Sequence, residues 1–137
     1  MAANQDTTVA NDAGAAKLPD GVRGIEGVDG IEGVVPQEAA GCTVFVHYNG
    51  PTDQLRDVSM GMAVLAPGAS PHAPHRHPEE EFLIVAAGTG EIVCGDTTTP
   101  VGPGAVLYCA GQTLHGITNT GRVPLTFYWS KWMARGA

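Results

Sequence analysis

Long apolar runs and clusters of basic residues are both missing from this sequence. No stretch reaches the roughly 20 consecutive apolar residues that a membrane helix requires, and residues 1–20 lack the basic start and apolar core of an export signal. We therefore expect a soluble, cytoplasmic protein. Seven Lys and Arg stand against 14 Asp and Glu, which gives a formal net charge of −7. Because the basic residues are scattered, neither nucleic acid nor a membrane is an expected partner.

Cysteine is also scarce. The three cysteines, Cys42, Cys94 and Cys109, lie far apart and show no CxxC spacing. An odd number at such distances argues against a disulfide scaffold and against a thiolate zinc site. We expect reduced thiols that pack against their neighbours.

Helical periodicity is absent, and the chain length suits one domain. Residues 1–18 are rich in Ala, Asn, Asp and Thr and are predicted to form a flexible tail. Residues 19–41 are predicted to form a glycine-rich lead-in, in which GIEGV occurs twice, with a short edge pairing as the alternative. The folded domain is expected over 42–137.

Short segments rich in β-branched and aromatic residues fill that domain, and Gly, Pro, Asn and Asp separate them. The expected strands are 42–48, 57–66, 81–87, 90–94, 105–109, 114–119 and 124–132. The close spacing of the turns predicts an all-β fold, an antiparallel barrel or sandwich. In 57–66 the residues Val58, Met60, Met62 and Val64 alternate with smaller or polar ones, so we expect both methionines in the core.

Histidine is concentrated in one place, with three of the five histidines between positions 72 and 77. In an extended chain residues i and i+2 project to the same side, so His75 and His77 can present two imidazoles to one point. Glu79 and Glu81 share this parity, and Glu81 is the preferred ligand because it opens an expected strand. His72 has the opposite parity and is expected at the rim of a pocket. Imidazole and carboxylate together suit one divalent ion of Fe, Mn, Ni, Co or Zn.

The pattern His75-x-His77-x-x-x-Glu81, followed by six residues and Gly88, resembles the first motif of the cupin family. The stretch from Gly104 to Asn119 resembles the second motif, with a glycine, a short strand, a turn and LHGITN. The sequence departs from the family in the second motif at Ala110 and Gln112, where proline and glycine are usual. It also has six residues instead of five between Gly68 and His75.

The resemblance covers roughly residues 42–132 and implies a single cupin β-barrel, an RmlC-like jelly roll. It also implies His115 as the fourth metal ligand, beside His75, His77 and Glu81. The resemblance favours small cupins, many of them exported and most without an assigned activity, and so it names the fold better than the function. A barrel in which the histidines form a polar core without metal is the alternative.

Three kinds of function are compatible with such a site. The leading prediction is an enzyme that uses Fe(II) as a dioxygenase on a small oxygen-rich molecule. The second is a non-redox lyase, isomerase or decarboxylase, in which the metal is a Lewis acid. That chemistry needs a base, and Tyr48, His47, Tyr108 and Glu81 are the candidates. The third is a barrel that binds a small ligand without turnover.

Apolar and aromatic side chains are expected to line the cavity of such a barrel. The predicted pocket residues are His47, Met60, Met62, Phe82, Phe127 and Trp129. In the last expected strand Phe127, Trp129 and Lys131 share one face and Tyr128 and Trp132 the other. Because both faces carry aromatic residues, we expect one of them to pair two copies as a homodimer.

Overall fold

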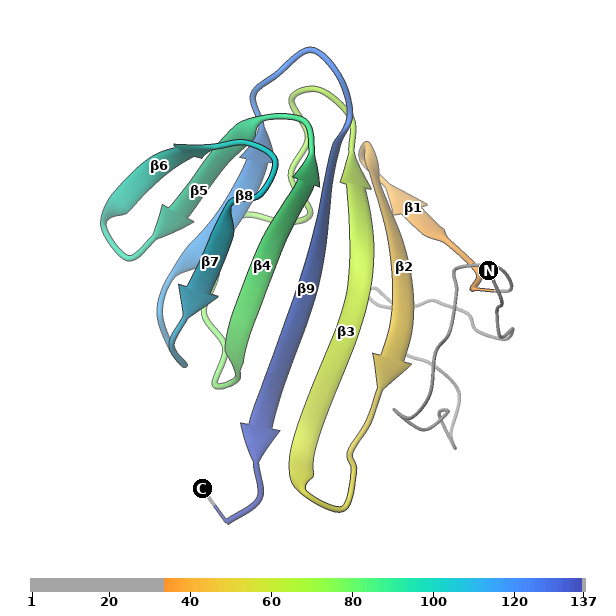
Figure 1. Cartoon of the computed structure of the whole chain (residues 1–137), viewed down its shortest axis with the longest axis vertical. Coiled ribbons are helices and arrows are strands. Elements are labelled where there is room, and N and C mark those ends of the chain that lie inside the picture. The colour runs from red at the N-terminus through yellow and green to blue at the C-terminus, as the bar shows by residue number, and fades with distance from the viewer. Residues whose placement is uncertain (1–33, 137) are drawn as a thin grey trace.

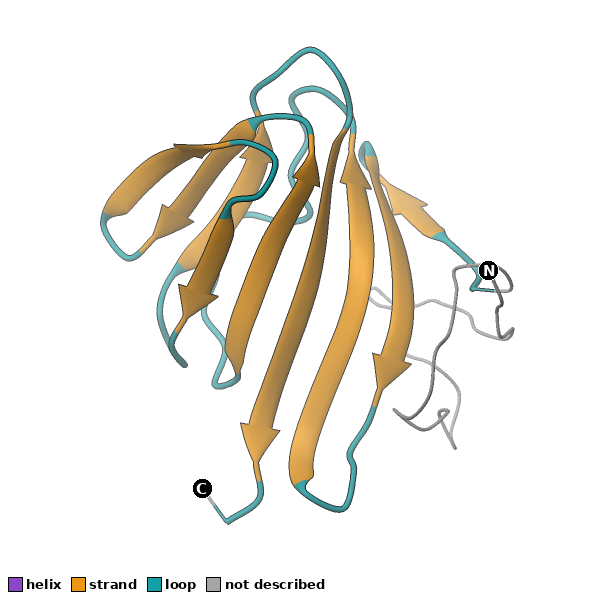
Figure 2. Ribbon diagram, viewed as in Figure 1, coloured by secondary structure: helices purple, strands orange, loops and turns teal. Residues whose placement is uncertain are grey.

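The computed structural model describes residues 34–136, and every regular element in that range is a β-strand (Figure 2). The strands are β1 (Gln37–Ala39), β2 (Cys42–Asn49), β3 (Leu55–Leu65), β4 (Glu80–Ala87), β5 (Gly90–Cys94), β6 (Thr97–Val101), β7 (Val106–Cys109), β8 (His115–Asn119) and β9 (Leu125–Ala134). The predicted all-β class is confirmed. The predicted tail and most of the predicted lead-in, 1–33, lie outside the described residues. No helix within 34–136 is long and apolar enough to span a membrane.

The strands form two antiparallel sheets (Figure 1). The larger sheet has the order β1-β2-β3-β9-β4-β7, and the smaller has the order β6-β5-β8. Buried side chains from both sheets make one core, which includes Leu65, Leu83 and Phe127 of the larger sheet and Ile92 and Ile117 of the smaller one. The core therefore lies between the sheets.

Two short strands lie in segments that the sequence analysis expected to be irregular. β1 pairs with β2 at the edge of the larger sheet, within the predicted lead-in, where edge pairing was the alternative. β6 occupies a stretch that was expected to be a turn, and it pairs only with β5. Its Pro100 marked the segment as a turn, but proline is tolerated in an edge strand, where no partner needs its missing N–H.

The face of β3 that was predicted to be the core face is the outer face of the sheet. Ala63 and Leu65 of the opposite face are buried in the core, while Met60 and Met62 are only partly buried and point away from it. Val58 is buried although it belongs to the predicted face, but it lies outside the core cluster. The reason is steric: a Cβ added to Gly61 would lie 2.5 Å from the Trp129 ring. Small residues face inward on β3 because β9 fills the interior with aromatic rings.

The three cysteines behave as packed thiols. None is in a disulfide, Cys42 and Cys109 are buried, and Cys94 is half-buried. Burial raises the pKa of Cys109 to about 11, with Cys94 adding to the shift. A thiol with this pKa stays protonated at neutral pH and is a poor nucleophile.

Candidate metal centre

His75 and His115 are tied together through their backbones. The N–H of each donates to the carbonyl of the other, at 3.0 and 2.9 Å, so the segment before β4 is bridged to the first residue of β8. Their ring centroids are 4.9 Å apart. This bridge places two imidazoles side by side, although 40 positions separate them in the sequence.

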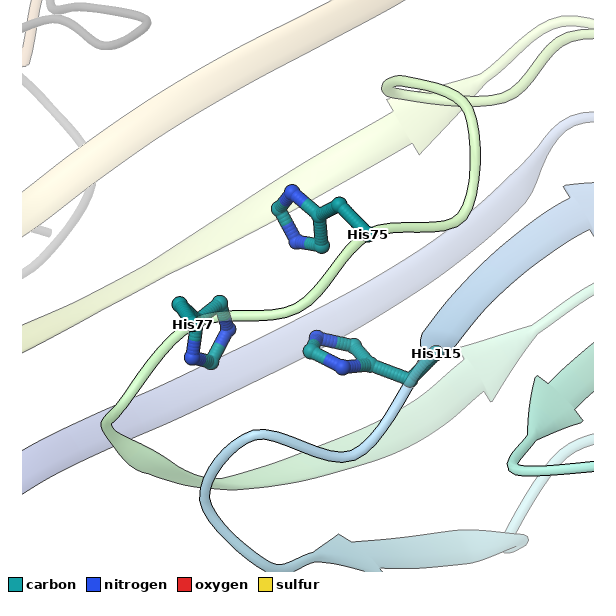
Figure 3. A group of neighbouring side chains, drawn as sticks. All are labelled: His75, His77 and His115. Carbon is teal, nitrogen blue, oxygen red and sulfur yellow. The ribbon is translucent and has the colours of Figure 1, made fainter.

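His77 completes a cluster of three imidazoles (Figure 3). Its ring centroid lies 5.1 Å from that of His75 and 4.6 Å from that of His115. One nitrogen from each of the three rings lies within 4.8 Å of the others. Figure 3 shows the rings converging from the segment before β4 and from the start of β8. Such a spacing suits three donors to one ion.

Glu81 lies against this cluster from β4. One of its carboxylate oxygens is 3.0 Å from Nε2 of His77 and 2.9 Å from Nε2 of His115. Burial of Glu81 would by itself raise its pKa, but the hydrogen bonds from His115 and His77 outweigh burial and lower the pKa to about 2. Glu81 is therefore an ionised carboxylate inside the protein, ready to act as an anionic ligand.

The ring nitrogens that face away from the cluster are also positioned. Nδ1 of His115 lies 2.9 Å from the Thr113 carbonyl, and Nδ1 of His77 lies 3.1 Å from the Glu79 carbonyl. A carbonyl oxygen can only accept, so in each of these contacts Nδ1 is the donor and Nε2 is the ring nitrogen that faces Glu81. Metal-binding histidines are oriented by contacts of this kind.

The protonation of the imidazoles fits a metal site as well. Burial, with the neighbouring His72, His115 and His77, lowers the pKa of His75 to about 4, so its ring is neutral at pH 7. The hydrogen bond to Glu81 raises the pKa of His115, against the effect of burial. A metal ion would take the place of the protons shared with Glu81. Three imidazoles and one carboxylate suit a divalent first-row ion.

The cluster opens into a cavity of about 510 Å³, within the size range of small-ligand pockets. Its apolar walls are formed by Val44, Val46, Ala63, Leu83, Ile117, Phe127 and Trp129. Its polar lining, besides the cluster, consists of Asn49, Asp57, Ser59, His72, Glu79 and Lys131. The cavity is thus apolar on one part of its wall and charged on another.

A profile of the cupin domain matches residues 61–131, which include the three histidines and Glu81. The chain belongs to the cupin family. The resemblance in its two motifs is confirmed, and no curated protein matches the sequence.

Solved structures agree with the cupin fold. An RmlC-like cupin from Shewanella frigidimarina NCIMB 400 has a TM-score of 0.66 at 12% identity, over 81% of this chain and 94% of that one. A cupin-superfamily sugar phosphate isomerase from Silicibacter pomeroyi DSS-3 has a TM-score of 0.58 at 22% identity, over 69% and 60%. An oxalate oxidase in complex with the substrate analogue glycolate has a TM-score of 0.50 at 23% identity, over 54% and 41%. The predicted jelly-roll barrel is confirmed, and identities this low show the fold alone.

Within this cupin, the structure brings together all four predicted metal ligands. Of the predicted pocket residues, Phe127 and Trp129 line the cavity. His72 also lines it, stacked on His75 with the ring centroids 3.8 Å apart.

The other predicted site residues do not line the cavity. Met60, Met62 and Phe82 point to the outer face, because their neighbours Ser59, Ala63 and Leu83 point inward. Tyr108 is also on the outer face, where its hydroxyl donates to Glu80 at 2.7 Å. His47 and Tyr48 lie at a register shift in β2, outside the cavity wall.

Three charged residues of the cavity were absent from the predicted site: Asp57, Glu79 and Lys131. Lys131 shares its face of β9 with Phe127 and Trp129, so strand parity could have found it. Asp57 was overlooked because the inner face of β3 was taken for the outer one.

Asp57 and Glu79 form an interacting pair beside Lys131. A hydrogen bond to Glu79, followed by burial, raises the pKa of Asp57 to about 6. The same hydrogen bond lowers the pKa of Glu79, and the charge of Lys131 lowers both pKa values. Near pH 5 the pair therefore shares one proton.

Proposed function

We propose that this cupin is a metal-dependent enzyme that acts on a small oxygen-rich organic molecule, with Fe(II)-dependent dioxygenation as its leading reaction. The observation that supports this proposal is the cluster of His75, His77, His115 and Glu81 in the wall of a cavity of about 510 Å³. If these four residues formed only a polar core and bound nothing, they would have no reason to line a cavity of this size.

The four residues would hold the ion, and Fe, Mn, Ni, Co and Zn all suit this donor set. When bound, the metal supplies Lewis-acid chemistry and, if it is iron, redox chemistry with dioxygen. The protein's own part is to orient the substrate and to exclude water. Leu83, Ile117 and Phe127 provide an apolar wall beside the cluster. A wall that excludes water limits side reactions with water.

The charged part of the cavity wall indicates which chemical group of a substrate would bind there. Lys131 lies across from Ser59 on β3 and from Glu81 on β4. It can pair with a carboxylate or another anionic group, while the hydroxyl of Ser59 offers a neutral hydrogen bond. Two structural neighbours are an oxalate oxidase and a sugar phosphate isomerase. Oxalate and sugar phosphates are small and oxygen-rich, which supports the same substrate class.

The Asp57–Glu79 pair favours a second candidate, the non-redox lyase, isomerase or decarboxylase. Such a reaction needs a group that gives and takes a proton, and Asp57 lines the cavity with a pKa of about 6. Tyr48 and Tyr108, the bases predicted from the sequence, do not line it. Glu81, which would hold the metal, stays a candidate base for this reaction.

The test begins with elemental analysis of protein purified without oxygen. Separate samples loaded with Fe(II), Mn(II), Ni(II), Co(II) or Zn(II) are then given small hydroxy acids, keto acids and sugar acids. Oxygen uptake and exchange of substrate protons with D₂O are both followed. Substrate-dependent uptake by the iron form would establish the leading reaction.

Proton exchange without oxygen uptake, slowed in Asp57→Asn at unchanged metal content, would establish the second candidate. Bound metal and bound ligand without either signal would leave a binding barrel, and the proposal that the chain is an enzyme would then be wrong. Absence of any bound metal would contradict the ligand set itself.

A further inference from the structure

Two of the three cysteines lie opposite metal ligands in the sheets. Cys94, the last residue of β5, is paired with His115 of β8, and Cys109, the last residue of β7, is paired with Glu81 of β4. Residues opposite each other in an antiparallel pair have Cα atoms about 4.5–5.5 Å apart and side chains on the same face. Because the side chains of His115 and Glu81 meet at 2.9 Å, their two cysteine partners are also brought close to each other.

Both thiols point into the space between the sheets. Ile92, two positions before Cys94, is in the core, and Leu107, two positions before Cys109, packs against it. Burial is the main cause of the raised pKa of Cys109, and a hydrogen bond with the Cys94 thiol adds to it, so the two thiols are in direct contact. Neither cysteine lines the cavity. The pair therefore lies beside the metal ligands but outside the space for a substrate.

Cys42, the third cysteine, is placed differently. It is paired with Leu65 of β3 inside the hydrophobic core, and burial is what raises its pKa. Three strands lie between β2 and β7 in the larger sheet, which corresponds to roughly 19 Å along the sheet at about 4.8 Å for each step. Cys42 is therefore a thiol of the same chain that is far from the pair.

We infer that Cys94 and Cys109 are a redox-sensitive thiol pair, which a peroxide oxidises to a disulfide. The Cys94 thiol is only half-buried, so a small oxidant reaches it first. Its sulfur loses a proton and takes one oxygen from hydrogen peroxide, which leaves a sulfenic acid and one water. The Cys109 sulfur then attacks the Cys94 sulfur and loses its own proton, and the hydroxyl group leaves as a second water. Two thiols and one hydrogen peroxide thus give one disulfide and two waters.

Direct contact compensates for the low reactivity of Cys109. A thiol with a pKa of about 11 is a poor nucleophile toward reagents in solution. The sulfenic acid of Cys94, however, is held beside the Cys109 sulfur, and groups held in contact react as if the partner were present at a very high concentration. No reagent has to enter the buried site of Cys109 for the second step. The expected product is therefore the disulfide, and not a more highly oxidised Cys94.

The disulfide would join the two sheets of the barrel, because β5 belongs to the smaller sheet and β7 to the larger one. It would also tie together the strand partners of Glu81 and His115. Cross-linking a loop of about 15 residues restricts the unfolded chain, and in a domain of this size the effect corresponds to a rise in melting temperature of roughly 10–20 °C. Oxidation should therefore make the barrel more stable.

The test treats full-length protein with hydrogen peroxide, after reduction, removal of the reductant and addition of a chelator for free metal ions. Intact mass, titration of thiols in denaturant, peptide mapping and thermal melting are measured before and after treatment. The unmodified chain is compared with Cys94→Ala, Cys109→Ala and the matched control Cys42→Ala. Since Cys94 is only half-buried, Cys94→Ala is the variant of the pair that is least disturbed in its folding, and melting of the reduced forms checks this.

We expect the unmodified chain and Cys42→Ala to lose the mass of two hydrogen atoms, with Cys94 and Cys109 in one cross-linked peptide. The melting temperature should rise by roughly 10–20 °C, and a dithiol reductant should reverse both changes. Folded Cys94→Ala and Cys109→Ala should show neither change. The inference would be overturned if every thiol survived an excess of peroxide, if Cys94 gained oxygen without joining Cys109, or if the disulfide included Cys42. A cross-link between Cys94 and Cys109 that left the melting temperature unchanged would contradict the stabilisation.

Discussion

Replacing His77 by alanine tests the metal centre most directly. The His77 side chain is only 13% exposed, but it is not part of the apolar core and comes from the segment between β3 and β4. The substitution removes one of the three imidazoles and one of the two hydrogen bonds to Glu81, while the contact of Glu81 with His115 at 2.9 Å is kept. The barrel should therefore fold, with a weakened site.

The expected magnitudes follow from these contacts. A hydrogen bond to a charged group contributes about 1.5–3 kcal/mol, so metal-free His77→Ala should unfold at a lower temperature, by roughly 4–8 °C for each kcal/mol lost. Changing a residue that only orients a ligand weakens metal binding about 10–100-fold, so losing a ligand should exceed that. A ligand present at about 100 times its dissociation constant stabilises a protein by about 2.7 kcal/mol. Most of this metal-induced stabilisation should vanish in His77→Ala.

The assay is elemental analysis of the purified protein, together with thermal melting before and after addition of metal. His72→Ala is the matched control, since His72 stacks on the His75 ring at 3.8 Å but is outside the cluster of three imidazoles. We expect the control to keep full metal content and the full thermal shift. Full occupancy and an unchanged shift in His77→Ala would refute the ligand assignment.

Two further predictions concern packing and pH. Gly61→Ala should lower the melting temperature and alter the fluorescence of Trp129, because the added Cβ would lie 2.5 Å from its ring and closer still to the backbone carbonyl oxygen of Phe45. Gly102→Ala, where the nearest atom would be 3.8 Å away, should change neither, and equal effects of the two would contradict the steric explanation. Because the pKa of Asp57 is raised to about 6, the folded chain holds this proton more tightly than the unfolded chain, and the free energy of unfolding should fall from about pH 4 to about pH 6. Denaturant titrations should show a smaller fall in Asp57→Asn than in the exposed control Asp53→Asn, and identical curves would count against a shared proton.

The fold could be predicted from the sequence because its signals are local. β-Branched segments and closely spaced turns defined seven of the nine strands, with ends within two residues of those observed. β6 escaped because its edge position, which allows Pro100, depends on the sheet order and leaves no trace in the segment itself. The inner face of β3 was misassigned for a related reason. Its inward residues are small because rings of β9 fill the space, and only the pairing of the two strands shows this.

The metal cluster could be predicted from the sequence more completely than the rest of the site. His75, His77 and Glu81 lie within seven positions, so strand parity alone brought them together, and the second motif added His115. The bridge between the backbones of His75 and His115 joins those motifs in space. Asp57 and Lys131 belong to neither motif. They reach the cavity through the pairing of β3 with β9 and of β9 with β4.

Because of this division, the residues that would hold the metal differ from the residues that determine which substrate fits the cavity. The ligands come from the segment around β4 and from the start of β8, whereas much of the cavity wall comes from β3 and β9. There, Nε1 of Trp129 donates to the Ser59 hydroxyl at 3.2 Å, and Gly61 leaves room for the Trp129 ring. Substitutions on β3 and β9 should therefore change which molecule fits while metal affinity stays the same. Relatives with the same ligands can then act on different molecules, because the motif that holds the metal does not shape the wall.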